Sequence, residues 1–308
     1  MTRRQLMSIL LGVVVLICAG VLLYSPIRLR LVVALGLGQG CTVERAREAP
    51  TNSDRLRRVK DRILAASKKI AQVGAYAQWS TPDGLYWIPV RNQYTLPFNL
   101  AEQEVDIYTL GPVHIKPGDV VMDCGANVGV YTRKALKAGA KLIVAIEPAP
   151  ENIDVLKRNF AAEIRQGRVI VYPKGVWDKE DTLILHKNSD DSAADSFVIN
   201  QERDKKTTHA SDEKLPVTTI DHIVAELGLD RVDFIKMDIE GAEVRAVRGA
   251  RKTIARDHPR MALCAYHRPS DPVELPKAVH LAWGGYTMLC GPCGTVGWRV
   301  RPDVLLFY

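Results

Sequence analysis

The sequence predicts an α/β fold with a doubly wound, mostly parallel sheet that ends in an antiparallel hairpin and is preceded by an N-terminal transmembrane helix. From Gly111 onward, short apolar runs alternate with helix-forming stretches, which is typical of parallel strands joined by helices on both faces of a sheet. The last two apolar runs are separated only by turn residues, so they are expected to pair as a hairpin. At 308 residues, the chain can hold one large domain and a smaller appendage.

The first element is an uncharged apolar run from Leu6 to Tyr24, preceded by Arg3 and Arg4. As a helix it would span roughly 28 Å, which is close to the hydrocarbon thickness of a bilayer. A cleaved signal peptide is the alternative, but it usually has a shorter apolar core and an A-x-A-like cleavage site, and no good site follows here. Residues 1–30 are therefore predicted to be a membrane anchor.

Residues 31–101 are expected to form a basic amphipathic helix followed by a linker or docking segment. The helix is predicted over Asp54 to Gln72, where basic side chains surround one apolar face. The residues of this face are Leu56, Val59, Ile63 and Ile70. Such a helix could lie on an anionic membrane surface, or it could pack its apolar face on the domain. Leu85 to Ala101 mixes aromatic residues with prolines, which suggests short strands or a docking segment.

The most informative motif is VVMDCGANVGVYT, from Val120 to Thr132. Its first residues form an apolar run that predicts a buried strand ending at Asp123. Gly125 and Gly129 bracket the turn that follows, and helix-forming residues continue through Ala138. Glycine at these two positions would let a ligand approach the backbone and the N-terminus of the helix. The alternative is a tight strand-to-helix connection that binds no ligand.

A second apolar run, LIVAIE, ends in Glu147, about 24 residues after Asp123, and an acid at this place can accept both hydroxyls of a ribose. The turn has Asn127 where the G-x-G-x-x-G dinucleotide motif has its middle glycine, and a side chain there disfavours a pyrophosphate. A nucleoside ligand without phosphates fits better. S-adenosylmethionine is such a ligand, and Asp123 with the turn amides could hold its amino acid end.

DFIKMDIEGAEVRAVRGA, from Asp233 to Ala250, repeats the strand–turn–helix pattern. Its buried strand leads to Asp238 and Glu240, at the strand end where ligands bind in open α/β sheets. These carboxylates are expected to face the sulfonium end of the donor together with Glu243, although Glu243 could instead serve only the dipole of its helix. His267 ends the next strand and adds a titratable group at the same edge, unless it is an ordinary surface histidine.

The remaining pattern sets the expected element boundaries. Strands are expected near Val120–Asp123, Leu142–Glu147, Val169–Tyr172, Val232–Asp238, Met261–His267, Tyr286–Cys290 and Val304–Tyr308. Helices are expected at Val130–Ala138, Glu151–Ile164, Ile220–Leu227, Ala242–Ala255 and Pro272–Trp283. The polar segment from Lys187 to Lys214 has few apolar residues, so it is expected to be a mobile solvated loop, with a substrate lid as the alternative.

Among the 6 cysteines, Cys290-Gly-Pro-Cys293 has the only spacing that carries chemistry. A redox pair needs a strand-to-helix context, and a zinc site needs a second pair of ligands, so neither is indicated. The pair is expected to be structural, in a plain hairpin turn between the two C-terminal strands.

The segment from about Glu104 to Tyr308 resembles the FkbM-type class I S-adenosylmethionine-dependent methyltransferases. The resemblance rests on VVMDCGANVGVYT, on AIEP with ENIDVLKRNF, on VTTIDHI and, most specifically, on FIKMDIEGAEVRAVRGA. It implies a Rossmann-like, seven-stranded sheet whose last strand is antiparallel, in a methyltransferase domain over residues 102–308. It also implies donor contacts at Asp123, Gly125, Asn127, Gly129, Glu147 and Asp238, with Trp177 and Asp178 near the adenine.

The sequence therefore predicts a membrane-anchored methyltransferase that uses S-adenosylmethionine to methylate a hydroxyl. Because transfer is a direct displacement at the sulfonium methyl, the protein mainly has to align donor and acceptor. Asp238, Glu240 and His267 are the candidates for positioning the hydroxyl or taking its proton. No metal is assigned, but a divalent cation would find its oxygen ligands in the same carboxylates.

The location of the domain suggests its partners. An anchored enzyme would meet a saccharide, a glycolipid or another small-molecule acceptor at the membrane, and a net charge of +7 is too modest to indicate nucleic acid. Arginines lie on both sides of the anchor, so the positive-inside rule barely discriminates between the two orientations. The methyl donor is made and kept in the cytosol, and the catalytic domain is therefore expected on the cytoplasmic side. A non-catalytic, methyltransferase-like scaffold is the alternative function, and Asn127 disfavours a nucleotide-dependent oxidoreductase.

Overall fold

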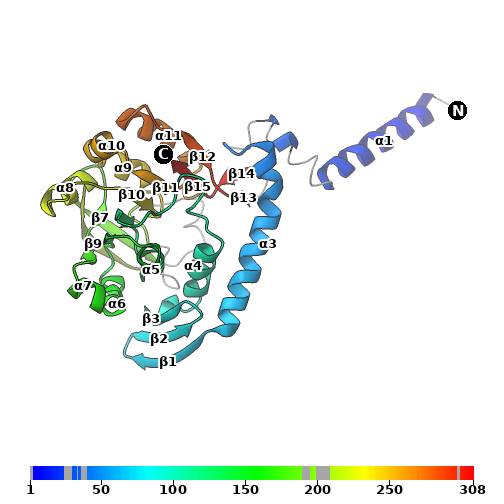
Figure 1. The fold of residues 1–308 in the computed structure, drawn as a ribbon. Helices are drawn as coiled ribbons and strands as arrows, with labels where there is room; N and C mark the ends of the chain where they lie inside the picture. Colours follow the sequence, from blue (N-terminus) through cyan, green and yellow to red (C-terminus); the bar gives the residue numbers. More distant parts are fainter. Residues whose placement is uncertain are drawn as a thin grey trace.

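The computed structural model describes residues 3–23, 30–32, 34–35, 40–188, 195–198, 209–296 and 299–308. A seven-stranded sheet forms the centre of the molecule (Figure 1). Its strands are β4 (Val120–Cys124), β5 (Leu142–Ile146), β6 (Val169–Tyr172), β10 (Phe234–Met237), β11 (Arg260–Cys264), β12 (Met288–Cys290) and β15 (Val304–Phe307). Their order across the sheet is β12-β15-β11-β10-β4-β5-β6, so β4 and β10 are neighbours at its middle.

The sheet is mixed rather than wholly parallel. Strands β4, β5, β6, β10 and β11 pair in parallel, whereas β15 runs antiparallel to both β11 and β12. The predicted α/β fold with antiparallel pairing of the last two strands of the sheet is thus confirmed. The expectation that only turn residues separate these two strands is wrong, because β13 (Cys293–Val296) and β14 (Arg299–Pro302) lie between them and pair with each other.

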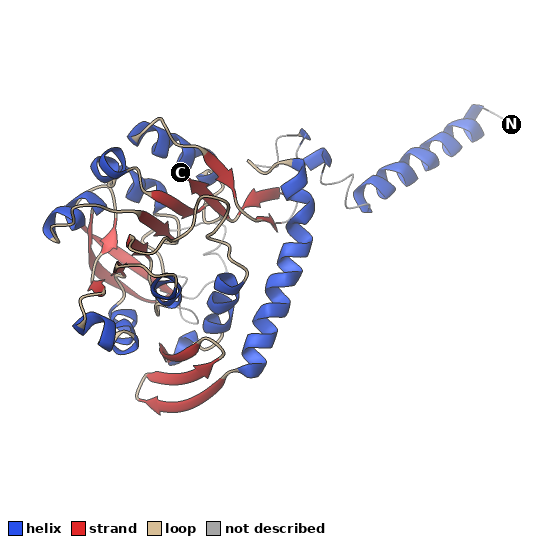
Figure 2. Cartoon of the chain, viewed as in Figure 1, coloured by secondary structure: helices blue, strands red, loops and turns tan. Residues whose placement is uncertain are grey.

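Helices cover both faces of the sheet, as Figure 2 shows. On one face pack α5 (Val130–Lys137), α6 (Pro150–Asn159) and α7 (Ala161–Arg165); on the other pack α8 (Ile220–Glu226), α9 (Glu243–Arg248), α10 (Arg251–Asp257) and α11 (Asp271–Ala282). Successive strand residues alternate between the two cores. Val121 and Phe234 belong to one core and Met122 and Ile235 to the other, because side chains along a strand point to opposite faces.

Two predicted helices are each divided in two. The helix expected over Glu151–Ile164 is interrupted at Phe160, whose φ of −123° leaves the helical range while its buried ring packs beside Gly129. The helix expected over Ala242–Ala255 is interrupted at Gly249. A Cβ at Gly249 would lie 2.1 Å from the carbonyl oxygen of Trp177, so the break coincides with a close approach of two backbones.

The N-terminal region begins with α1 (Arg3–Leu23), a helix long and apolar enough to cross a membrane, with side chains that are exposed through most of its described length. A signal sequence would have the same length and composition at this position. Figure 1 shows α1 extending away from the body of the molecule. The apolar helix is therefore confirmed, and its membrane insertion stays a prediction.

A long helix, α3 (Val43–Ala66), runs along one side of the body and leads to a small antiparallel sheet, followed by η1 and α4 (Figure 1). These elements are β1 (Lys68–Val73), β2 (Tyr76–Thr81), β3 (Gly84–Pro89), η1 (Val90–Asn92) and α4 (Thr95–Glu104). The amphipathic helix predicted from Asp54 to Gln72 thus begins earlier, at Val43, and ends earlier, at Ala66. Leu56, Val59 and Ile63 pack against the core formed with β3 and α4, so the apolar face of the helix covers the domain.

The polar segment from Lys187 to Lys214 contains the ends of two strands. Strand β8 (Asp181–Asn188) pairs antiparallel with β9 (His209–Thr218), and β9 also pairs in parallel with β7 (Gly175–Val176). The prediction of a loop is therefore wrong at both ends of this segment, because main-chain pairing overrides its polar composition. Residues 189–194 and 199–208 lie outside the described residues.

Candidate functional site

The turn after β4 is shaped by two glycines with left-handed backbones. Gly125 has a φ of +76°, and a Cβ there would lie 2.0 Å from the carbonyl oxygen of Asp238. Gly129 has a φ of +90°, and a Cβ there would lie 2.1 Å from the Phe160 ring. Both glycines are thus required by conformation and close packing. Gly125 lines the central cavity and Gly129 does not. The need to leave space for a ligand can therefore account for glycine at position 125 but not at position 129.

Asn127 and Glu147 meet at the open end of this turn. The backbone N–H of Asn127 donates to Oε2 of Glu147 over 2.9 Å, and the backbone N–H of Ala149 donates to Oε1 over 3.0 Å. Asn127 holds its place with a φ of +49°, which asparagine tolerates better than most residues. Burial raises the pKa of Glu147 to about 7, although these hydrogen bonds oppose the shift. The carboxylate therefore sits at the cavity wall in an environment that holds its proton near neutral pH.

Asp123 lies beneath the turn rather than in the cavity. Its buried carboxylate accepts a hydrogen bond from Oγ1 of Thr132 over 2.6 Å and forms an ion pair with Nζ of Lys236 at 3.3 Å. Lys236 also donates to the carbonyl oxygen of Gly125 over 2.9 Å. The Asp123–Lys236 pair thus fixes the base of the turn, and Asp123 is not among the residues that line the cavity.

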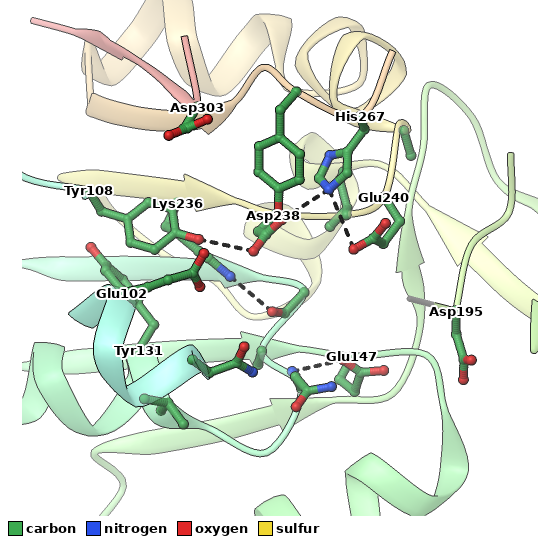
Figure 3. Close-up of a pocket in the computed structure, with 18 of the residues that line it drawn as sticks. Glu102, Tyr108, Tyr131, Glu147, Asp195, Lys236, Asp238, Glu240, His267 and Asp303 are labelled. Carbon is green, nitrogen blue, oxygen red and sulfur yellow. Dashed lines mark hydrogen bonds and ion pairs between the residues drawn. The ribbon is translucent and has the colours of Figure 1, made fainter. Parts of the chain in front are cut away.

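Asp238 follows β10 and lies beside two tyrosines. The hydroxyl of Tyr108 donates to Oδ2 of Asp238 over 3.0 Å, and that of Tyr266 donates to Oδ1 over 3.3 Å. Burial alone would raise the pKa of this carboxyl, but the cations of Lys236 and His267 outweigh burial and hold the pKa below its ordinary value. Asp238 is therefore a carboxylate with two phenol groups directed toward it, of which Figure 3 labels Tyr108.

His267 is enclosed by acidic side chains. Its Nδ1 lies 2.9 Å from Oε1 of Glu243, and its Nε2 lies 3.4 Å from a carboxylate oxygen of both Asp238 and Glu240. Glu243 is itself buried and accepts hydrogen bonds from the backbone N–H groups of Ile239 and Gly241. Burial lowers the pKa of His267, but Glu240 and Glu243 outweigh burial and raise it well above its ordinary value.

One cavity of about 820 Å³ joins the turn to this acidic cluster at the carboxyl ends of the central strands. Figure 3 shows Glu147 at one end and Asp238, Glu240 and His267 at the other. Of the predicted residues, the cavity wall includes Gly125, Asn127, Glu147, Asp238, Glu240 and His267. The structure therefore brings the two sequence motifs together around one space, as ligand binding at a topological switch point requires.

Trp177 and Asp178 are placed away from this cavity. Oδ2 of Asp178 accepts a hydrogen bond from Arg245 over 2.7 Å, and the Arg245 guanidinium lies 5.3 Å from the centre of the Trp177 ring. Neither residue lines the cavity. The wall on this side is formed by Lys174, Gly175 and Val176, just before them in the chain.

Several wall residues were not predicted from the sequence. They include Glu102, Tyr108, Tyr131, Asp195, Lys236 and Tyr266. The sequence could have indicated Lys236, because a lysine inside an otherwise apolar strand needs a buried partner. No sequence feature indicated Glu102, because this residue lies on α4 and reaches the cavity only through tertiary packing. Burial raises the pKa of Glu102 well above its ordinary value, with Asp238 adding to the shift.

The acidic cluster also has the ligand atoms of a hard cation site. One ligand atom from each of Asp238, Glu240 and His267 lies within 4.8 Å of the others. A cation bound there would compete with a proton for the lone pair of Nε2, because the acidic neighbours raise the pKa of His267 well above its ordinary value.

Comparison with protein families places these residues in a known context. Residues 123–281 match the family model described as the methyltransferase FkbM domain. The chain is 24% identical over 151 residues to the 2-O-methyltransferase NoeI of Sinorhizobium fredii, covering 46% of this chain and 61% of NoeI. It is 26% identical over 163 residues to the 31-O-demethyl-FK506 methyltransferase FkbM of Streptomyces tacrolimicus, covering 44% of this chain and 61% of that protein. The matched segment thus spans about three fifths of each of these relatives.

Two solved structures are similar to the chain in part. The methyltransferase FkbM from Methylobacillus flagellatus KT shares 20% identity with the chain, at a TM-score of 0.47, over 84% of this chain and 59% of that one. The M. jannaschii TYW2 structure in complex with AdoMet shares 14% identity at a TM-score of 0.39, over 78% of this chain and 88% of that one.

Proposed function

Because this chain belongs to the methyltransferase FkbM family, we propose that it transfers a methyl group from S-adenosylmethionine to a hydroxyl of a saccharide, a glycolipid or another small acceptor. One observation supports this proposal above all others. A single cavity connects the Asn127–Glu147 end of the turn with the Asp238–Glu240–His267 cluster, so a donor and an acceptor can meet within it.

The donor is assigned to the end of the cavity nearest β4 and β5. The Glu147 carboxylate would accept hydrogen bonds from the ribose hydroxyls, and the wall residues Gly125 to Asn127 would lie along the amino acid part of the donor. Lys174 to Val176 would adjoin the adenine, in place of Trp177 and Asp178. The sulfonium would then point toward Asp238, whose negative charge favours a cation.

The acceptor hydroxyl is assigned to the space in front of His267. In a direct displacement, the hydroxyl oxygen forms a bond to the methyl carbon while the carbon–sulfur bond breaks, and the hydroxyl proton passes to Nε2 of His267. Glu243 orients the ring through Nδ1, which leaves Nε2 directed to the cavity side of the cluster. The ring must be neutral to act as a base. A bound sulfonium cation near Asp238 would lower the pKa of His267 by repulsion and so favour that form.

Two features favour oxygen as the acceptor atom. NoeI is a 2-O-methyltransferase and the Streptomyces FkbM protein is a 31-O-demethyl-FK506 methyltransferase, so each name specifies an oxygen position. A base oriented by a carboxylate also suits a hydroxyl, which must lose a proton during transfer. The acceptor class itself rests on the expected place of the protein at a membrane.

Binding and turnover of the full chain in detergent test this proposal. Labelled S-adenosylmethionine is expected to bind saturably, and Glu147→Ala is expected to weaken binding by at least tenfold, because a buried hydrogen-bond acceptor for the ribose is lost. Asp230→Asn is the matched control, since Asp230 is exposed on the surface. Binding without transfer to any extracted lipid or glycan would instead favour the scaffold function, and absence of binding would exclude the donor assignment.

The acceptor can be found by comparing lipid and glycan extracts from cells with and without the gene. A species that loses the mass of one methyl-for-hydrogen exchange when the gene is deleted is expected. If the methylated species reappears with the wild-type gene but not with the His267→Ala gene, methyl transfer is assigned to this cavity.

The membrane side of the domain is a separate part of the proposal. We place the domain in the cytoplasm because the donor is made there. The disulfide between Cys41 and Cys293 argues in the opposite direction, since disulfides are rare in a reducing cytosol. The two sides of the membrane can be distinguished by protease treatment of intact cells that express the protein with a C-terminal tag. A tag that is protected supports the cytoplasmic side, and a tag that is digested places the domain on the opposite side. Release of the chain by alkaline carbonate would rule out the anchor.

A further inference from the structure

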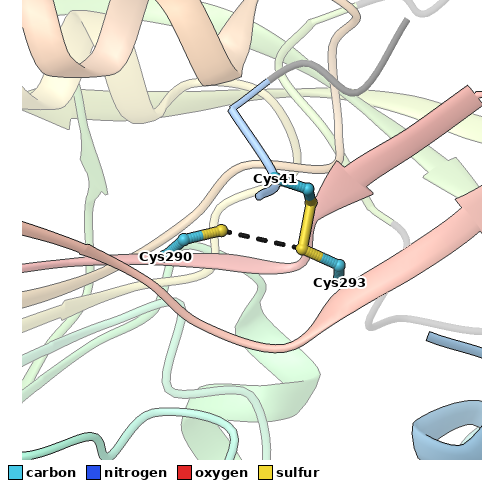
Figure 4. A group of neighbouring side chains, drawn as sticks. All are labelled: Cys41, Cys290 and Cys293. Atoms are coloured by element: carbon cyan, nitrogen blue, oxygen red, sulfur yellow. Dashed lines mark hydrogen bonds between the residues drawn. A yellow bond between two sulfur atoms is a disulfide. The ribbon is translucent and has the colours of Figure 1, made fainter. Parts of the chain in front are cut away.

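Three cysteines from distant parts of the chain meet outside the cavity. Cys41 precedes α3, Cys290 ends β12 and Cys293 begins β13 (Figure 4). Cys41 and Cys293 form a disulfide, and Sγ of the free Cys290 lies 3.6 Å from Sγ of Cys293. All three sulfur atoms lie within 4.8 Å of one another. A thiol in contact with a disulfide sulfur is the arrangement from which thiol–disulfide exchange starts.

The disulfide joins two functional parts of the molecule. Cys41 lies just before the N-terminal end of α3. Cys293 belongs to the β13–β14 arm, the antiparallel pair formed by β13 and β14. Gly294, Arg301 and Asp303, in or next to this arm, line the cavity. Both bonded cysteines are buried, and they pack with Ala46 and Ala49 of α3 and with other apolar side chains. The bond therefore ties the start of α3 to a wall of the proposed active site.

We propose that Cys41, Cys290 and Cys293 form a thiol–disulfide exchange site in which the disulfide moves from Cys41–Cys293 to Cys290–Cys293. The thiolate of Cys290 attacks Sγ of Cys293, and the new bond forms as the bond to Cys41 breaks. Cys41 leaves as a thiolate and takes up the proton that Cys290 has lost. One disulfide and one thiol are present before and after, so the step needs no oxidant or reductant.

The exchange changes what the disulfide constrains. Cys41–Cys293 links residues separated by 252 positions and holds α3 against the arm. Cys290–Cys293 would instead close a short local loop between β12 and β13. After the exchange, the start of α3 would be held to the β13–β14 arm by packing alone, and the arm would be freer to adjust its part of the cavity wall.

The surroundings of Cys290 set the speed of this step. Burial raises the pKa of the Cys290 thiol to about 11, while Arg45 of α3 opposes the shift and Asp303 beside β15 adds to it. Only a small fraction is thiolate at neutral pH, so the bond to Cys41 is stable there. The exchange rate is expected to rise about tenfold per pH unit until the pH approaches that pKa.

Disulfide mapping of the full chain tests the proposal. The protein is purified in detergent without reductant, incubated at pH 7.0, 8.0 or 9.0, quenched in acid, alkylated and mapped by mass spectrometry. We expect a Cys41–Cys293 linkage with alkylated Cys290 at the start, and a Cys290–Cys293 linkage with alkylated Cys41 that accumulates faster at higher pH. The rate is expected to be independent of protein concentration, as an intramolecular step requires.

Cys290→Ser is the matched variant, because it removes the attacking thiol and leaves the disulfide in place. It is expected to retain the Cys41–Cys293 linkage at every pH. If wild-type Cys41 stays linked to Cys293 at pH 9.0 to the same extent as in this variant, the proposal is wrong. It is also wrong if Cys41 and Cys293 are both alkylated in the protein as isolated.

Discussion

Oε1 of Glu243 lies 2.9 Å from Nδ1 of His267, and this buried contact joins the start of α9 to the segment that follows β11. Two backbone N–H groups hold the Glu243 carboxylate in place, so the carboxylate in turn holds the imidazole. The pairing explains how a histidine beyond the end of β11 can present Nε2 to the cavity in one orientation.

Replacement of Glu243 by glutamine is expected to move the pH profile of the reaction. Although burial lowers the pKa of His267, Glu240 and Glu243 raise it well above its ordinary value, so the neutral base forms at a higher pH than in an ordinary histidine. Glu243→Gln removes one of the two carboxylate charges that raise this pKa. The rise of kcat/KM with pH should shift to lower pH, while the maximum rate falls about tenfold because the ring is held less firmly. Rates measured from pH 6 to pH 10 check both effects.

Two variants accompany this measurement. His267→Ala should lower kcat by about 10²- to 10⁴-fold at all pH values, because the proton acceptor is gone. Glu44→Gln, on the exposed first turn of α3, should leave the profile unchanged. A Glu243→Gln profile that overlays the wild type would show that Glu243 has no influence on the catalytic base.

Donor affinity should depend on the protonation of Glu147. Burial raises its pKa to about 7, and a ribose can donate two hydrogen bonds only to the ionised form. The dissociation constant for S-adenosylmethionine is therefore expected to increase as the pH falls below about 7, approaching tenfold per unit. Calorimetric titration between pH 5.5 and 8.5 measures it. Glu147→Gln should bind more weakly and lose this dependence, and a variant that keeps the dependence would assign it to another group.

A methyl group at Gly125 should destabilise the fold. Gly125→Ala combines a left-handed backbone, φ +76°, with a Cβ placed 2.0 Å from a carbonyl oxygen of Asp238. The free energy of unfolding is expected to fall by about 3 kcal/mol or more. Gly228→Ala is the matched control, because Gly228 has a φ of +61° and no atom within 4 Å of the added Cβ. It should cost only about 1 kcal/mol by thermal unfolding in detergent. Equal losses would show that the contact with Asp238 is unimportant.

Asp123 and Lys236, the buried ion pair beneath the turn, should affect the free energy of unfolding as a coupled pair rather than independently. Lys236→Met leaves Asp123 buried beside an uncharged side chain, and the free energy of unfolding is expected to fall by about 3–5 kcal/mol. Adding Asp123→Asn removes the stranded charge and should recover a large part of this loss. If the double variant is as unstable as the sum of the two single variants, the two residues act independently.

The strands around the site could be predicted from the sequence because they are covered on both faces. Such strands appear as continuous apolar runs, and the carboxyl ends of neighbouring parallel strands meet at one edge. Asp123 and Asp238 were placed at that edge for this reason. The sequence did not show that Asp123 points down to Lys236 while Asp238 points into the cavity, because that choice depends on packing around each side chain.

Long-range pairings could not be predicted from local spacing. The short spacing of Cys290 and Cys293 indicated a local turn, whereas the disulfide joins Cys293 to Cys41 across 252 positions. Similarly, nothing near Glu102 indicated that α4 would bring it to the same space as Asp238. Such contacts depend on how the N-terminal elements pack on the sheet, and an amphipathic pattern shows only that one face will be covered.

The cavity wall has a further consequence for how acceptors are chosen. The family match begins at residue 123, yet Ser53, Leu56, Phe98 and Glu102 also line the cavity. The segment that matches the family model therefore supplies the proposed donor end, while elements that precede this segment contribute other parts of the cavity wall. Exchanging that segment between two members of the family should transfer acceptor selectivity with it and leave donor affinity behind.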